Sequence, residues 1–211
     1  MTELIDKLAN DLTPAPRRRA SRQLLLLLIP GVAVSLAVGL SLFGLRSDFE
    51  DALGGGPFWM KLGTMIALGA LFFPIAARLA VPGRDAGLWP YACAALVAVL
   101  LLAGGAQLAL TPAPERMQTW LGHSWHACPW RVALLGLPIL AAAIIGVRRL
   151  APTRLRAAGA ATGLFAGAAG AAAYSLSCGE TSVAFLATWY LLGVLVVAGL
   201  GWLIGPRMLR W

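Results

Sequence analysis

Six long apolar runs dominate this 211-residue chain and limit what it can fold into. Each run is about 20 residues long, which is the length that a helix needs to cross about 30 Å of hydrocarbon. The runs are continuous rather than alternating, so they favour helices over the strands of a membrane barrel. The sequence therefore predicts an all-α integral membrane bundle of six transmembrane helices. We place them at about 23–45, 58–80, 88–110, 126–147, 157–177 and 183–205.

The composition agrees with lipid as the solvent and narrows the function. The chain is 59% hydrophobic and 12% charged, whereas soluble domains are about 45–50% apolar and about 25% charged. So few polar residues leave no nucleophile–base–acid set, and we do not expect an enzyme. The net charge of +8 would suggest nucleic acid in a soluble protein. Here the arginines lie between the apolar runs, so topology explains them better and no direct nucleic-acid binding is expected.

The basic residues also predict the orientation in the membrane. Thirteen of the 17 lysines and arginines fall in the N-terminal segment, the second and fourth loops and the C-terminus. The positive-inside rule then places both termini in the cytoplasm. We divide the chain into a cytoplasmic N-terminal segment, residues 1–22, and a transmembrane domain, residues 23–211. Four basic residues fall on the other side: Arg46, Lys61, Arg116 and Arg131.

The N-terminal segment contains an apolar stripe. Its spacing predicts one face of a short amphipathic helix that ends before Pro14. Acidic residues interrupt the other sides of this helix, whereas helices that rest on a membrane prefer lysine and arginine there. The pattern therefore favours a protein partner, whose groove the stripe would enter. The residues of the stripe are Leu4, Ile5, Leu8 and Leu12.

Two cysteines are expected at the outer ends of the fourth and fifth runs. These runs form an antiparallel hairpin, so Cys128 and Cys178 should lie at the same depth. A disulfide needs Cα atoms within about 7 Å, and the sequence leaves that distance open. His123 and His126 precede Cys128 and are candidate ligands for a soft metal. Their spacing matches no standard zinc motif, and ordinary buried residues near a helix end are the alternative.

Two further features concern packing. Gly159, Gly163 and Gly167 repeat every four residues, so they share one helix face and allow a neighbouring backbone to approach. A packing seam inside one bundle is favoured over a homo-oligomer interface. Lys61 lies one turn inside the second run, and a charge within the membrane is a candidate functional residue. Its depth favours the alternative, which is snorkelling to the outer headgroups. Arg131 has the same two interpretations, with outer-face acids as candidate partners, namely Asp48, Glu50, Asp51 or Glu180.

Several short motifs follow one another along nearly the whole chain. They are LIDKLANDLTP, FWMKL, GHSW, APTR, SCGE, TWY and RMLRW, together with Cys128 and Cys178. A string of this kind is much more specific than hydropathy alone. It resembles the NrsF family of bacterial multi-pass membrane anti-sigma factors.

The resemblance implies a function. Family members hold a sigma factor of the extracytoplasmic-function class inactive at the bacterial inner membrane. The family's sigma-binding part corresponds to the N-terminal segment, and its two sensing cysteines correspond to Cys128 and Cys178. The signals implied are heavy metal or oxidative stress, so no resident cofactor is expected beyond a transient metal ion at the two thiols.

Two other functions remain as alternatives. A small multi-pass transporter or channel would need a polar path through the bundle. The runs contain little to form one beyond Thr64, Gln107, Thr162 and Ser175. A membrane thiol oxidoreductase would usually need a CxxC motif or a second cysteine pair. The chain has three cysteines and no CxxC.

Overall fold

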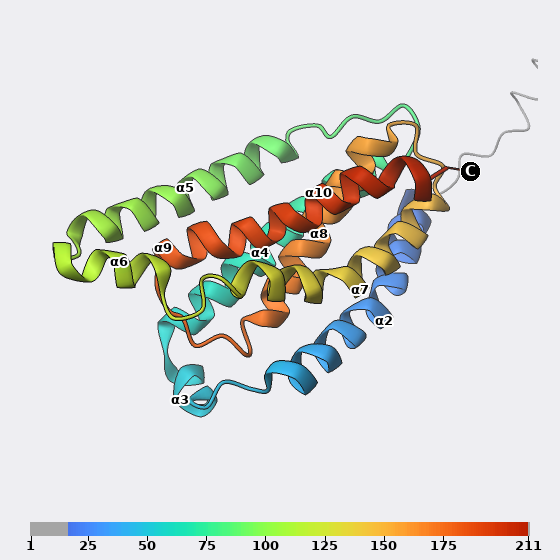
Figure 1. Cartoon of the computed structure of the whole chain (residues 1–211). Coiled ribbons are helices and arrows are strands. Elements are labelled where there is room, and N and C mark those ends of the chain that lie inside the picture. The colour runs from blue at the N-terminus through green and yellow to red at the C-terminus, as the bar shows by residue number, and fades with distance from the viewer. Residues whose placement is uncertain (1–16, 211) are drawn as a thin grey trace, which may run out of the picture.

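The computed structural model describes the backbone of residues 17–210 and the side chains of residues 26–210, and it is helical with no strand in that part of the chain (Figure 1). The predicted all-α class is therefore confirmed for the described residues. The amphipathic helix predicted around Leu4, Ile5, Leu8 and Leu12 lies outside them. The helices are α2 (Arg17–Phe43), α3 (Phe49–Gly54), α4 (Gly56–Leu79), α5 (Trp89–Leu110), α6 (Ala113–Leu121), α7 (Cys128–Arg148), α8 (Leu155–Tyr174), α9 (Val183–Phe185), the π-helix η1 (Leu186–Tyr190) and α10 (Leu191–Met208).

Five helices of the described chain are long and apolar enough to cross a membrane, so the prediction of six is wrong by one. They lie in α2, α4, α5, α7 and the continuous run α9–η1–α10. The helix that falls short is α8, whose 20 residues are mostly alanine and glycine. Such small side chains give α8 little apolar surface of its own. Its place is the interior of the bundle, where α4, α7 and α10 pack around it.

Glycines allow α8 to occupy that interior. Gly159, Gly163 and Gly167 all face α10. A Cβ atom on Gly163 would lie 2.5 Å from the carbonyl oxygen of Val197, and one on Gly159 would collide with the carbonyl oxygen of Gly201. The two backbones are therefore in direct contact, which compensates for the absence of a hydrophobic drive between helices in lipid.

The long helices run back and forth, so the bundle has two ends (Figure 1). At one end lie the loops 80–88 and 149–154, which we call the arginine end. Leu28 near the start of α2 and Leu209 after α10 belong to the same buried cluster there. The opposite end holds residues 44–55, 111–127 and the turn 175–182, and we call it the cysteine end.

Candidate functional site

The turn between α8 and α9, residues 175–182, holds Cys178, and we call it the cysteine turn. It continues α8 briefly, because the amide of Cys178 donates to the carbonyl of Tyr174 at 3.0 Å. The chain that follows α2 is fastened to it, since the amide of Arg46 donates to the carbonyl of Leu176 at 3.2 Å. Segments far apart in the sequence therefore meet at this turn.

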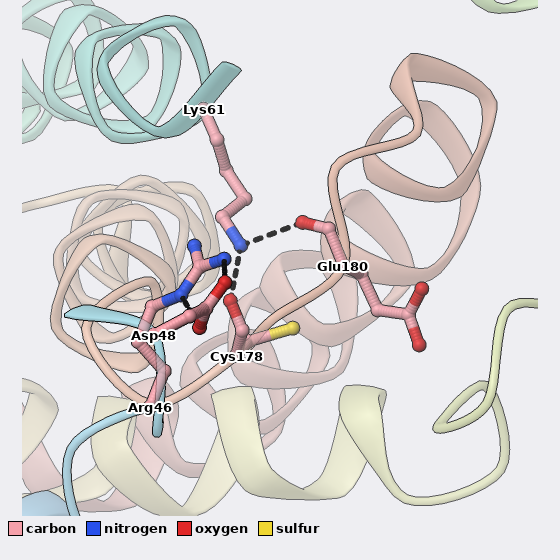
Figure 2. Close-up of polar contacts among 5 residues, drawn as sticks. All are labelled: Arg46, Asp48, Lys61, Cys178 and Glu180. Carbon is pink, nitrogen blue, oxygen red and sulfur yellow. Dashed lines mark hydrogen bonds and ion pairs between the residues drawn. The ribbon is translucent and has the colours of Figure 1, made fainter. Parts of the chain in front are cut away.

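Lys61 of α4 is the main side-chain anchor of the cysteine turn. Its ammonium group donates to the carbonyl of Cys178 at 2.6 Å and to the carbonyl of Glu180 at 2.8 Å (Figure 2). The Nζ atom also lies 5.6 Å from the ring centroid of Tyr190. Lys61 is only 3% exposed, so the predicted snorkelling to the headgroups is wrong. The two carbonyls of the turn offer the ammonium partners inside the protein, and the side chain bends towards them.

A second buried cation, Arg46, lies beside the turn. Its guanidinium is bidentate to Asp48, with distances of 2.7 Å and 2.6 Å (Figure 2). That hydrogen bonding raises the pKa of Arg46 above its usual value and holds the pKa of Asp48 below its own. The ion pair is therefore stable at ordinary pH. The remaining nitrogen, Nη1, is buried without a hydrogen-bond partner among the described residues.

A third cation, Arg131, joins α7 to α8 and to the end of α2. Its Nη1 donates to the hydroxyl of Tyr174 at 3.2 Å. Its guanidinium carbon lies 5.0 Å from the ring centroid of Phe43. A phenol and an aromatic ring therefore contact Arg131 in place of the acids that the sequence offered as candidate partners.

The two cysteines lie at the same depth of the bundle. Gly170 of α8 packs against the backbone of Gly136 of the antiparallel α7. Cys128 precedes Gly136 by eight residues and Cys178 follows Gly170 by eight. Both cysteines are buried, at 0% and 3% exposure, and both are free thiols.

A pocket of about 360 Å³ opens at the cysteine turn, and Cys178 is the cysteine that lines it. Arg131 and Glu180 face it from two sides. A small polar reagent that enters the pocket would therefore meet the Cys178 residue before Cys128. The lining residues are His123, Ser124, Arg131, Tyr174, Ser177, Cys178, Gly179 and Glu180.

The histidines do not join the thiols in this conformation. The side chain of His123 is 84% exposed, and its backbone amide donates to Glu180 Oε1 at 2.7 Å. His126 is also exposed and stacks edge-on against Trp125. Between residues 17 and 210 no group of three or more His, Cys, Asp or Glu is placed to hold a metal ion. A soft ion at this end would therefore depend on the thiols rather than on the two imidazoles.

Sequence reasoning missed how Glu180 and Tyr190 contribute. Glu180 holds the loop before α7, and Gly122 makes this possible with a φ of 56° and no side chain in the path of the carboxylate. Tyr190 ends the π-helix η1, is fully buried, and packs on Tyr174 with ring centroids 5.8 Å apart. The sequence shows Gly122, but no pattern in it indicated the π-helix. Short π-helical segments are often found at functional sites.

Comparison with known proteins identifies the family. A family model described as NrsF, negative regulator of sigma F, matches residues 8–211. The probable anti-sigma-F factor NrsF of Azospira oryzae is 39% identical over 184 residues, which cover 86% of this chain and 85% of that protein. The anti-sigma-F factor NrsF of Caulobacter vibrioides is 37% identical over 214 residues, which cover 99% of this chain and 98% of that protein. No solved structure matches the chain. The family resemblance predicted from the short motifs is thus confirmed, and the chain belongs to the NrsF family of negative regulators of sigma F.

Proposed function

We propose that this chain is a membrane-bound anti-sigma factor, whose N-terminal segment sequesters a sigma factor of the extracytoplasmic-function class. The observation that supports this most directly is the family match, which extends over residues 8–211. Both relatives are named anti-sigma-F factors, and each is covered over 85% or more of its length. The apolar stripe of the N-terminal segment supplies a surface that a cytoplasmic protein can mask.

The proposed location is the bacterial inner membrane, with both termini in the cytoplasm. Five long apolar helices favour a membrane protein. The excess of arginine at the arginine end favours the cytoplasm for that end. The cysteine end would then face the periplasm, where oxidised cysteines persist.

The proposed trigger is a change at Cys128 and Cys178. Cys178 lines the polar pocket at the cysteine turn, and the buried Lys61 binds its backbone carbonyl. With hydrogen peroxide, the Cys178 thiolate attacks one oxygen, the O–O bond breaks and hydroxide leaves, which gives a sulfenic acid. The Cys128 thiol then attacks that sulfur, a disulfide forms, and the hydroxyl leaves as water with the Cys128 proton.

A heavy-metal ion is the second proposed trigger. Soft ions prefer thiolate ligands. Two thiolates at one depth could hold such an ion, with release of both thiol protons. Either trigger changes the sigma-factor affinity only if it favours one arrangement of the protein over another.

The buried polar groups favour a regulator over a transporter. Among the described residues five polar or charged side chains are buried, namely Ser35, Arg46, Lys61, Thr162 and Ser175. The three hydroxyls donate to backbone carbonyls of the bundle. At the cysteine end, Arg46 binds Asp48 and Lys61 binds two backbone carbonyls of the cysteine turn. These groups offer no continuous polar path along the bundle.

The experiment that tests the proposed function changes the apolar stripe. We expect Leu8→Asp in the full chain, in lipid nanodiscs, to weaken retention of the sigma F homologue from the same genome at least tenfold. A charge in an apolar contact should cost about 2 kcal/mol or more, and 1.4 kcal/mol corresponds to tenfold in affinity. The measurement is the dissociation constant of the purified sigma factor on the nanodisc.

The matched control is Asn10→Asp, which adds the same charge on the opposite side of the predicted helix and should leave the affinity unchanged. Equal retention by wild type and Leu8→Asp would count against the stripe as the binding surface. Failure of the wild-type chain to retain the sigma factor would count against the proposed function as a whole.

A further inference from the structure

Three contacts fasten the end of α2 and the residues that follow it to the end of α8, to the start of the cysteine turn and to α7. The amide of Arg46 donates to the carbonyl of Leu176, two residues before Cys178. The ring of Phe43 meets the ring of Tyr174 edge-on, with centroids 5.9 Å apart. Arg131 covers the face of the same Phe43 ring at 5.0 Å. A change at Cys178 therefore acts on groups that hold the end of α2.

The body of α2 is held mainly by α7, with fewer contacts to α8. On α7, the carbonyl of Leu135 accepts from Ser35 at 2.8 Å and Ala142 lies close to Gly31. On the side towards α4 lies an apolar groove of about 480 Å³, lined by α2, α4 and α8. By contrast, α8 and α10 touch backbone to backbone. Among the helices at the cysteine turn, α2 therefore has the most room to tilt.

A tilt of α2 would also move the N-terminal segment, because that segment leads directly into α2. Helix α2 has 27 residues and joins directly to residues 1–16. A helix of that length is a rod of about 40 Å, so a displacement at one end tilts the other.

We propose that Phe43 and Arg46 are positioning residues, which fix α2 against the cysteine turn and thereby set the placement of the N-terminal segment. The proposal rests on the proposed function, because it describes how the state of Cys178 reaches the bound sigma factor. Chemical change at Cys178 displaces Leu176 and Tyr174, their contacts with Arg46 and Phe43 weaken, and α2 tilts into the groove beside α4.

The test measures the position of α2 directly in the full chain, in lipid nanodiscs. Spin labels on ketone-bearing amino acids replace Leu26 of α2 and Ile145 of α7, which are 55% and 53% exposed near the arginine end. This attachment leaves the three cysteines untouched. The variant Phe43→Leu/Arg46→Pro removes both the aromatic ring and the backbone amide that donates to Leu176. We expect its distance distribution to shift by about 2 Å or to broaden, as interface helices do in switching transitions. Retention of the sigma F homologue should change at least threefold in the same variant.

Two controls separate a positioning role from a general loss of structure. Arg116→Met removes an exposed cation whose bonds go to Thr111 and Ala109 of its own segment, and should change neither readout. Phe43→Leu/Arg46→Lys keeps the backbone amide that donates to Leu176 and should recover part of the wild-type distribution. If the double variant does not stay monodisperse, the same two measurements are made on Phe43→Leu alone. Leucine keeps an apolar side chain at this position, so this variant should remain folded.

An unchanged distance distribution would overturn the proposal, and so would a changed distribution with unchanged retention. If the wild-type chain retains no sigma factor, the proposed function fails. The distance measurement still decides whether Phe43 and Arg46 position α2.

Discussion

Gly163→Ala should destabilise the bundle, because the added methyl group has no room between α8 and α10. The new Cβ would lie 2.5 Å from the Val197 carbonyl oxygen and 2.7 Å from the Cα of Ala198. Both are backbone atoms, so relief requires α8 and α10 to move apart along their contact. Overpacking costs about 1–3 kcal/mol, and we expect the upper part of that range. The measurement is the midpoint of thermal unfolding in detergent.

The matched control for this change is Gly199→Ala on α10, where a Cβ would meet no atom within 4 Å. It should leave the midpoint unchanged or raise it slightly, since alanine favours the helix over glycine. Equal midpoints for Gly163→Ala and wild type would show that the α8–α10 contact is looser than the structure has it.

Lys61→Met should loosen the cysteine turn. Methionine keeps much of the length of the stem but leaves the carbonyls of Cys178 and Glu180 without their donor. Each buried acceptor left unpaired costs about 1–3 kcal/mol. We therefore expect backbone amides of residues 175–182 to exchange with deuterium at least tenfold faster, because 1.4 kcal/mol corresponds to tenfold in an equilibrium constant.

Thr64→Val on the same helix is the control for Lys61→Met. The hydroxyl of Thr64 donates to the carbonyl of Met60 within α4, so its loss should leave exchange in the cysteine turn unaffected. If the amides of the cysteine turn exchange at the same rate in Lys61→Met as in wild type, Lys61 does not hold the turn.

The long helices were predictable because length and apolarity are properties of a single segment. All six predicted runs are helical within a few residues of the expected limits. The number of candidate membrane-spanning helices was not predictable. Helix α8 has the length of a spanning helix, but its side chains are small and it is buried by the helices packed around it. Burial of that kind depends on tertiary packing, which hydropathy along the chain does not measure.

The candidate site was predictable in part, for a similar reason. The hairpin argument correctly placed Cys128 and Cys178 at one depth, because it needs only helix lengths and antiparallel order. The partners of Lys61 and Arg131 were not predictable. Backbone carbonyls in a turn, a phenol and aromatic rings satisfy these cations. A sequence shows which residues are charged, but it does not show which carbonyls a turn leaves unpaired.

The most direct measurement of the central claim is release of a bound sigma factor by thiol chemistry. The full chain in nanodiscs is loaded with the sigma F homologue and then treated with hydrogen peroxide or with Cd²⁺. We expect at least tenfold weaker retention for wild type after either treatment. The same is expected for Cys93→Ser, which changes the third cysteine, a buried residue of α5. For Cys128→Ser/Cys178→Ser we expect retention that neither treatment changes. Release from this double variant to the same extent as from wild type would contradict the account, because the signal would then act elsewhere than at the two thiols.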